Sequence, residues 1–281
     1  HLIEKNPVDT YHGYAHYINA QSLHILSKIG LDIEQLTSKM LPTKQALSMS
    51  YGCRLDQPLA QINLLDEPNI AAEFFRFGPW GASINSGYQC WRGQLLTLLD
   101  KKTIPTYWQH KLTHLDPIAK IARVRSHDGN TIEFEYKYLL ACDGNQSTVR
   151  QLLQTPFQQE PKTWQSFVSV SAKGDLTPFI PQQYLLNWLY QYDYSCCMVN
   201  HGDHHIWQFP VYSTRQSHAL KENRALELIA NFCGIESKDL VMSGYQILRI
   251  DSWRMKTHSL EKMHDRSVFF CGDSAHCLTP A

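Results

Sequence analysis

The sequence predicts an α/β fold with two domains, one of a nucleotide-binding type and one built on an antiparallel sheet. At three places a strand-like apolar run ends in an acidic residue: Glu4, Asp143 or Asp273. Open α/β sheets bind ligands at such carboxyl ends of strands. Residues 164–212 alternate in a strand-like pattern rich in aromatic side chains, which suits an antiparallel sheet with one buried face. A chain of 281 residues is long enough for both domains.

The amino-acid composition indicates which kinds of molecule the protein is expected to bind. Lys and Arg number 26, as do Asp and Glu, so the net charge is about zero and gives no reason to expect a nucleic-acid partner. No run of about 18 apolar residues occurs, so we expect no stable membrane insertion. These features favour a small-molecule partner and are compatible with a homodimer.

The eight cysteines include no C-x-x-C pair, and several, such as Cys142 and Cys271, lie in apolar strand-like runs. Free cysteine usually packs as a small core residue. We therefore expect reduced, buried thiols and a cytoplasmic location. Cys196 and Cys197 are adjacent in the chain, which disfavours a redox role for that pair.

The two ends of the sequence are unusual. The first residues are typical of the end of a strand that is stopped by Pro7, with Glu4 at its tip. In a dinucleotide-binding unit such an acid holds ribose hydroxyls about 20 residues after a Gly-rich turn, which here would precede residue 1. The sequence stops at 279–281, where a helix would be expected to begin. We therefore expect a chain that is incomplete at both ends.

In the first half, periodicity and capping predict the following elements. Asn19 can cap a helix that Gly30 ends. Residues 47–77 are rich in strand-forming side chains, and a helix is predicted from Gln89 to Leu99.

Further along, two strands at 118–126 and 131–138 flank a hairpin turn. A strand, a tight turn and a helix follow at 138–153. The spacing of apolar residues predicts a helix at 221–233 and a last buried strand at 267–271.

These elements divide into two predicted domains. The nucleotide-binding domain comprises residues 1–163 and 243–281, with a β-rich insertion near 47–77. The sheet domain comprises residues 164–242.

The first acidic turn lies within Leu139–Arg150, a buried strand that ends in Asp143-Gly144 and enters a helix capped by Ser147. The turn offers a carboxylate for sugar hydroxyls, a glycine where backbone must approach a ligand, a helix N-terminus for phosphate, and Arg150 one turn into the helix. An Asp-Gly turn is also an ordinary connection between a strand and a helix. Each part nevertheless suits a nucleotide.

The second acidic turn lies within Val268–Pro280, where a strand again delivers an acid, Asp273, to the start of a predicted helix. Asp can accept hydrogen bonds from a polyol, and Gly272 lets a flat ring system lie against backbone. Gly-Asp alone is a weak signal. Gly-Asp-Ser-Ala-His followed by Pro280, directly after a buried strand, is specific.

These two strings, in this order and with Glu4 before them, resemble the p-hydroxybenzoate hydroxylase-like family of FAD-dependent monooxygenases. The resemblance implies a Rossmann-like FAD-binding domain with an inserted antiparallel-sheet substrate domain. It implies that Asp143–Arg150 contacts both FAD and the nicotinamide cofactor, and that Gly272–Pro280 contacts the ribityl chain and the isoalloxazine edge. Gln89 matches a position that contacts FAD, and residues 15–19 resemble the phenol-hydroxylase branch.

The cofactor-binding residues implied by this resemblance are Glu4, Gln89, Asp143, Gly144, Ser147, Arg150, Gly272, Asp273 and Pro280. Three positions depart from the pattern of the branch, which usually has a basic or amide residue, an Arg and a Glu where this sequence has Tyr14, Gln21 and His24.

The resemblance implies an enzyme that uses FAD, NAD(P)H and dioxygen to hydroxylate a small aromatic molecule such as a phenol. Epoxidation, Baeyer-Villiger oxygenation or reduction on the same fold stays open, because a fold does not fix the chemistry. A truncated, non-catalytic protein that serves as a binding module also stays open. No catalytic residue is assigned, because the cofactor carries the reactive chemistry.

Three other features have simpler interpretations. Three histidines and an aspartate crowd into residues 201–205, but the adjacent His204 and His205 would point to opposite faces of a strand, so we predict a hairpin turn without a metal. His276 is expected to pack rather than to act as a base. For the aromatic run Trp188–Tyr194, core packing and a substrate-lining role both stay open.

Overall fold

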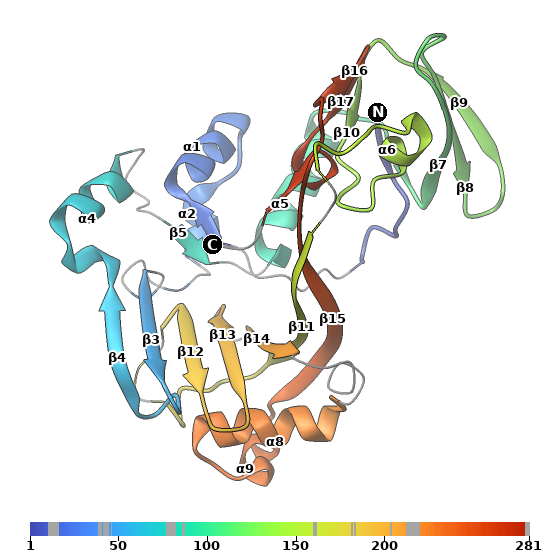
Figure 1. Ribbon diagram of the computed structural model, residues 1–281. Coiled ribbons are helices and arrows are strands. Elements are labelled where there is room, and N and C mark those ends of the chain that lie inside the picture. Colours follow the sequence, from blue (N-terminus) through green and yellow to red (C-terminus); the bar gives the residue numbers. More distant parts are fainter. Residues whose placement is uncertain are drawn as a thin grey trace. The chain divides into compact units, whose positions relative to one another are not determined.

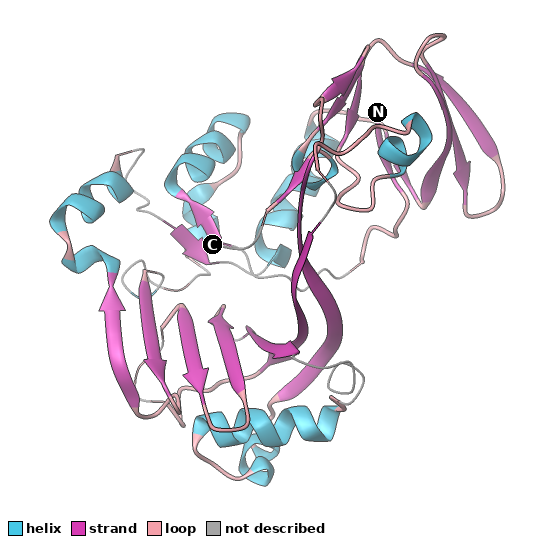
Figure 2. Cartoon of the chain, viewed as in Figure 1, coloured by secondary structure: helices cyan, strands magenta, loops and turns pink. Residues whose placement is uncertain are grey.

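The fold is mixed α/β, as the sequence predicts (Figures 1 and 2). The computed structural model describes residues 1–10, 17–38, 41, 45, 47–76, 83–85, 88–159, 162–180, 182, 184–202, 204–211 and 220–278. The chain forms two compact units: the first comprises His1–Thr10, Thr103–Gln165 and Arg254–Ala281, and the second Tyr11–Lys102 and Ser166–Trp253.

The first unit contains two parallel strand pairs. These are β1 (Leu2–Glu4) with β6 (Thr106–Trp108), and β10 (Leu139–Ala141) with β17 (Val268–Phe270). The short β16 (His264–Asp265) pairs antiparallel with the other edge of β17. An antiparallel three-stranded sheet comprises β7 (His110–Asp116), β8 (Ile121–Ser126) and β9 (Thr131–Glu135), with the predicted hairpin turn between β8 and β9.

The core of the first unit joins these elements around α6 (Thr148–Leu153). Val149 of the helix packs with Ala141 of β10, Phe270 of β17 and Leu115 of β7. Each of these side chains is at most 7% exposed. The acidic turns that follow β10 and β17 therefore start from a well-packed base.

In the second unit, α1 (Ala20–Ile29) begins and ends where the sequence predicts. The Asn19 side chain accepts a hydrogen bond from the backbone N–H of Ser22, and Gly30 ends the helix with φ of 106°, a left-handed conformation that glycine adopts without strain. Leu23 packs with α2 (Ile33–Thr37) and with α5 (Tyr88–Lys101). The antiparallel strands β2 (Tyr17–Asn19) and β5 (Ser83–Asn85) lie in the same unit.

An eight-stranded sheet has the order β18-β15-β11-β14-β13-β12-β3-β4. Its strands are β3 (Ser48–Gly52), β4 (Pro58–Asn63), β11 (Lys162–Lys173), β12 (Leu186–Tyr190), β13 (Ser195–Asn200), β14 (His204–Val211), β15 (Gln246–Ser259) and β18 (His276–Cys277). The pairings of β11, β12, β13 and β14 are antiparallel, as predicted, whereas β12 pairs with β3 in parallel. The structure thus places β3 and β4, which come from the predicted β-rich stretch, in the same sheet as the aromatic strands.

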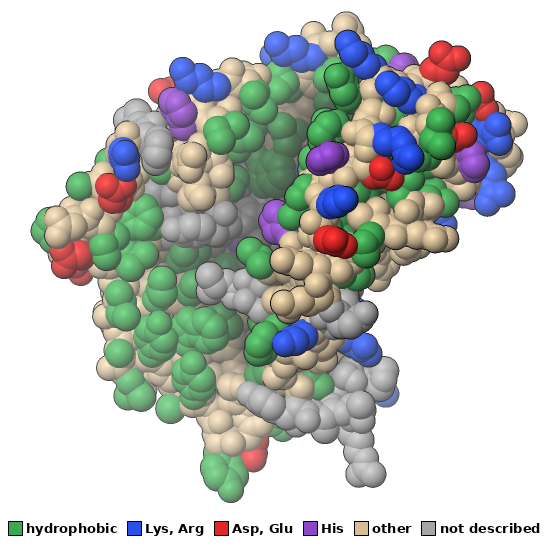
Figure 3. Space-filling model, turned by 45° about the horizontal axis from the view of Figure 1, so that its top comes forward, with side chains coloured by type: hydrophobic (Ala, Val, Ile, Leu, Met, Phe, Trp, Pro, Cys, Tyr) green, Lys and Arg blue, Asp and Glu red, His purple; other side chains and the backbone are tan. Residues whose placement is uncertain are grey.

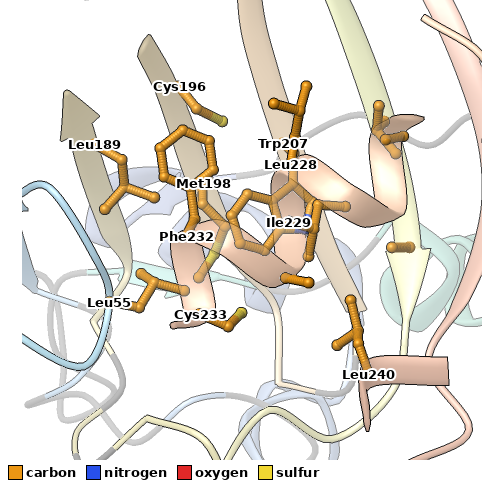
Figure 4. Close-up of a cluster of buried hydrophobic side chains, with 14 of the residues drawn as sticks. Leu55, Leu189, Cys196, Met198, Trp207, Leu228, Ile229, Phe232, Cys233 and Leu240 are labelled. Atoms are coloured by element: carbon orange, nitrogen blue, oxygen red, sulfur yellow. The ribbon is translucent and has the colours of Figure 1, made fainter. Parts of the chain in front are cut away.

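Two helices, α8 (Glu222–Cys233) and α9 (Ser237–Met242), cover one face of this sheet (Figure 1). Trp207 of β14 and Phe232 of α8 stack with ring centroids 6.3 Å apart, and both are at most 1% exposed (Figure 4). Burial of such a side chain stabilises the fold by roughly 1.5 to 3 kcal/mol. Because side chains alternate along a strand, Ile206 and Gln208 lie on the other face of the sheet.

Two predicted elements differ from the structure. The β-rich stretch gives way after Asn63 to the short helix η1 (Leu64–Asp66) and to α4 (Pro68–Phe75), which has proline in its first turn. That position is favourable because proline needs no intrahelical N–H partner there. After Phe270, the chain makes a single 3-10 turn, η2 (Gly272–Ser274), and enters β18, so the described residues show no α-helix there.

The expectation of buried thiols is wrong for three cysteines. Cys53, Cys142 and Cys271 are free and exposed, whereas Cys196 and Cys233 are free and buried. Cys142 and Cys271 follow the last residues of their strands, where the apolar run that predicts burial has already ended.

Two further features concern the chain as a whole. The two compact units divide the chain at other residues than the predicted domain boundaries, and those boundaries stay a prediction. None of the described helices has the length and apolar character needed to cross a membrane.

Candidate functional site

The two acidic turns lie side by side, because they follow the carboxyl ends of the neighbouring parallel strands β10 and β17. Ala141 of β10 is in register with Phe270 of β17. The N–H of Cys271 donates to the carbonyl oxygen of Ala141 at 2.9 Å, which extends the strand pairing by one step. The structure therefore brings together Asp143 and Asp273, which are far apart in the sequence.

The first turn caps α6 with two side chains. Ser147 is fully buried, and its Oγ accepts from the N–H of Arg150 at 3.0 Å. Oδ2 of Asp143 accepts from the N–H of Val149, also at 3.0 Å. The carboxylate is exposed, and its Oδ1 has no hydrogen-bond donor among the residues that the structure describes. Asp143 thus has a structural partner and an acceptor atom that a ligand could use.

The second turn is held by the buried Ser274. Its Oγ donates to the carbonyl oxygen of Ala141 at 2.5 Å and accepts from the N–H of Cys271 at 3.0 Å. These contacts fix the backbone on both sides of Asp273. The Asp273 carboxylate itself is exposed and has no hydrogen-bond donor within the described part of the chain. It is therefore available to accept hydrogen bonds from a ligand.

Arg150 connects the two turns. Its Nη1 donates to the carbonyl oxygen of Ser274 at 3.2 Å, and its Nη2 donates to that of Asn145 at 2.5 Å. The guanidinium lies 4.8 Å from the centre of the Phe157 ring. Burial lowers the pKa of Arg150, and the nearby Asp143 opposes that effect. Arg150 is thus a buried cation that holds backbone carbonyl groups.

His258 of β15 contacts the second turn from another side. It is 9% exposed, and its Nε2 lies 3.2 Å from the carbonyl oxygen of Asp273. Its ring packs on Phe157 with centroids 5.0 Å apart. Burial is the main cause that lowers the pKa of His258, which favours the neutral ring. The Nε2–H tautomer would donate to Asp273.

Both turns leave room for a ligand. Gly144 has φ of 77° and Gly272 has φ of 61°, so both adopt a left-handed conformation. A Cβ atom added at either glycine would meet no atom of the described residues within 4 Å, its two chain neighbours aside. Exposed carboxylate oxygens beside accessible backbone suit a polyol or a nucleotide, whose hydroxyl groups donate hydrogen bonds. The residues present therefore fit a ligand with a sugar or sugar-alcohol chain.

The other predicted site residues have different positions. Glu4 ends β1 in the same unit as both turns, and its Oε1 accepts from the N–H of Asn6 at 2.8 Å. Gln89 lies in α5 of the second unit, and its side chain is outside the described residues. Pro280 also lies outside them.

Sequence reasoning missed Ser274, Phe157 and His258. Ser274 stands inside the quoted Gly-Asp string, and a serine four residues after a strand end is a signal for a side chain that bonds back to the backbone. Phe157 and His258 carry no local signal, because their contacts with Arg150 and with the second turn depend on the tertiary fold.

In the histidine-rich stretch, the side chains of His204 and His205 point to opposite faces of the strand, as predicted. His204 is half-buried and His205 is fully buried on the first strand positions of β14. His205 lies 3.2 Å from the hydroxyl of Tyr245 through its Nδ1. Asp203 is outside the described residues, and among those described no group of three or more His, Cys, Asp and Glu could hold a metal.

The sheet face opposite α8 and α9 carries part of the aromatic run. Trp188 of β12 is in register with Tyr51 of β3 and with Cys197 of β13. Hydrophobic side chains gather over this end of the sheet in Figure 3. Beyond the strand, Tyr192 is fully exposed in the turn. The aromatic residues of Trp188–Tyr194 therefore do not all pack against α8 and α9.

Comparisons with known proteins agree with this geometry. The family model for the FAD binding domain matches residues 1–281. No curated protein matches the sequence. Among solved structures, the complex of aklavinone-11 hydroxylase with FAD and aklavinone is 19% identical with a TM-score of 0.81, over 99% of this chain and 53% of that chain.

Two more flavoenzymes have the same fold. The flavin-dependent monooxygenase PieE, in complex with FAD and substrate, is 16% identical with a TM-score of 0.83, over 98% of this chain and 48% of that chain. The p-nitrophenol 4-monooxygenase PnpA from Pseudomonas putida DLL-E4 is 14% identical with a TM-score of 0.75, over 98% of this chain and 66% of that chain. This chain spans about half the length of the first two. It belongs to the family of FAD-binding domains and has the fold of the p-hydroxybenzoate hydroxylase-like flavin monooxygenases.

Proposed function

We propose that the chain belongs to an FAD-dependent monooxygenase that uses NAD(P)H and dioxygen to hydroxylate a small aromatic molecule. The observation that carries this proposal is the pair of acidic turns at one sheet edge, in a chain whose whole length matches the FAD-binding domain family. When bound, FAD would supply the redox chemistry of oxygen transfer. The chain's own residues would bind the FAD and orient it toward the substrate.

The proposed contacts follow from which acceptor atoms are available. Asp273 accepts hydrogen bonds from the ribityl hydroxyls, because its carboxylate has no donor among the described residues. Oδ1 of Asp143 and Oε2 of Glu4 are the remaining acceptor atoms for hydroxyl groups of the nucleotide, those of the ribose included. Gly144 and Gly272 let the ligand approach the backbone. We retain Ser147, Gln89 and Pro280 as further proposed contributors.

We propose that Arg150 acts mainly as a positioning residue. Two of its terminal nitrogen atoms donate to carbonyl oxygens of the two turns, and the guanidinium is buried against Phe157. A role for Asp143–Arg150 in contacting NAD(P)H stays a prediction. In either case, a change at Arg150 alters the turn that carries Asp273.

We propose the sheet face around Tyr51 and Trp188 as the surface that lines the aromatic substrate. Aromatic side chains on one sheet face can stack with a flat ring. The names of aklavinone-11 hydroxylase and p-nitrophenol 4-monooxygenase support an aromatic substrate for a protein with this fold.

The proposal is tested by measuring NAD(P)H oxidation and oxygen consumption by the full-length flavoprotein over a panel of phenols and larger aromatic molecules. The expected result is substrate-stimulated oxidation of NAD(P)H and a product that has gained one oxygen atom. Conversion to an epoxide or an ester would favour another oxygenase on this fold. A protein that binds neither flavin nor NAD(P)H would instead support the non-catalytic binding module.

A further inference from the structure

Cys142 and Cys271 occupy equivalent places on neighbouring parallel strands. The register pairs Leu140 with Phe269 and Ala141 with Phe270, so the two cysteines form the next pair along the ladder. The 2.9 Å hydrogen bond from the N–H of Cys271 to Ala141 shows that the strands are still joined at this step.

The two thiols lie on the same exposed side of the sheet. Ala141 and Phe270 are buried, whereas Leu140 is 65% exposed and Phe269 is 37% exposed. Because side chains alternate along a strand, Cys142 and Cys271 share the face of the exposed pair. Both are free and exposed.

Their separation suits a covalent link. Neighbouring strands lie about 4.8 Å apart, which falls within the Cα separation of about 4.4 to 6.8 Å that disulfides span. The thiols also influence each other: burial is the first cause that raises the pKa of Cys142, and the nearness of Cys271 is the second.

We propose that Cys142 and Cys271 form a redox-reactive dithiol site that hydrogen peroxide converts into a disulfide. One thiol takes an oxygen atom from the peroxide, becomes a sulfenic acid and releases water. The sulfur of the second thiol then displaces the hydroxyl group, which leaves as water with the thiol proton. The two sulfur atoms lose two electrons in total, and the peroxide gains them.

Among the cysteines whose side chains the structure describes, the others lack this combination of exposure and an exposed neighbouring cysteine. Cys196 is buried, and burial raises the pKa of Cys197 to about 12. Cys277 is partly buried, and its partner in the strand register is His258 rather than another cysteine. Cys53 is exposed but belongs to the second unit, so it is a matched control for simple accessibility.

The first experiment exposes the whole protein to hydrogen peroxide, blocks the remaining thiols and identifies linked peptides by mass spectrometry without reduction. The expected result is a Cys142–Cys271 linked peptide and a protein mass lower by two hydrogen atoms, both reversed by reductant. Cys142→Ser and Cys271→Ser should each abolish the link, and Cys53→Ser should leave it intact. Separate oxidation of both cysteines to sulfinic acids in the wild type would overturn the proposal.

A second measurement needs no variant and therefore does not depend on how the substituted proteins fold. A trivalent arsenical that bridges two thiols, such as phenylarsine oxide, should bind the reduced wild type at Cys142 and Cys271 and resist removal by a monothiol. A dithiol should release it. Attachment to either cysteine alone, with ready release by the monothiol, would contradict the proposal. The pairing of the two thiols depends on the register of β10 and β17 and not on flavin binding.

Discussion

Arg150 and Ser274 are hydrogen-bonded across the candidate site: Nη1 of Arg150 donates to the carbonyl oxygen of Ser274 at 3.2 Å, between residues 124 positions apart. Arg150 belongs to the helix that follows the first acidic turn, and Ser274 ends the second. His258 adds a contact to the neighbouring carbonyl group of Asp273. The second turn is therefore held in place by side chains from elsewhere in the first unit.

The first prediction concerns this contact. Arg150→Met should keep most of the apolar packing on Phe157 and remove two hydrogen bonds from a buried cation. Hydrogen bonds to charged groups contribute about 1.5 to 3 kcal/mol each, so the loss of two should lower the free energy of unfolding by about 3 to 6 kcal/mol. Urea denaturation, followed by circular dichroism, measures this change.

Arg123→Met is the matched control in the same unit. Arg123 pairs with Glu133 at 2.7 Å, but both side chains are about half exposed. Exposed ion pairs contribute about 0 to 1 kcal/mol, so this variant should lose far less stability. Equal losses for the two variants would contradict the positioning role of Arg150.

The second prediction concerns the cap of α6. Asp143→Ala removes the acceptor of the Val149 N–H and should lower the free energy of unfolding by about 1 kcal/mol. Asp143→Asn keeps an oxygen acceptor and should cost less. Thermal and urea unfolding of the two variants measure the difference. Indistinguishable stabilities for wild type and Asp143→Ala would show that this hydrogen bond does not stabilise the helix.

The third prediction concerns pH. Burial lowers the pKa of His258 in the folded protein. Below the unfolded pKa of about 6.5, the unfolded chain takes up a proton that the folded protein does not, so the free energy of unfolding should decrease as the pH falls from that value toward the folded pKa.

His258→Gln should weaken this loss of stability, because glutamine does not titrate. His127→Gln, in the exposed turn between β8 and β9, is the control. Urea denaturation at about pH 7.5 and about pH 5.5 gives the comparison. A pH dependence of His258→Gln equal to that of the wild type would refute the assignment.

Local signals in the sequence predicted much of the fold. Asn19 and Gly30 bound α1 because a cap and a left-handed glycine act within a few residues. Ser147 starts α6 for the same reason. The acidic turns were found because a buried strand followed by Asp is visible in the sequence, and the parallel pairing of β10 and β17 brings those turns together.

Non-local contacts could not be predicted from the sequence. The strand-rich stretch near 47–77 gave no warning of α4, and the apolar runs before Cys142 and Cys271 suggested burial where the structure shows exposure. The positioning of Arg150 depends on a carbonyl group in a different segment of the chain. Sequence patterns predict which side chains could bind, but not which are already engaged within the protein.

The most direct test of the proposed flavin site is the dissociation constant of FAD for Asp273→Ala, with Asp128→Ala in the β8–β9 turn as the control. The Asp273 carboxylate has no donor among the described residues, so its loss should leave the free energy of unfolding nearly unchanged. The loss of an acceptor for a bound hydroxyl costs about 1 to 3 kcal/mol, so the dissociation constant should rise roughly 5- to 150-fold, and excess FAD should restore binding. Asp128→Ala should bind FAD as the wild type does. An unchanged dissociation constant for Asp273→Ala would contradict the claim that the paired acidic turns form the flavin site.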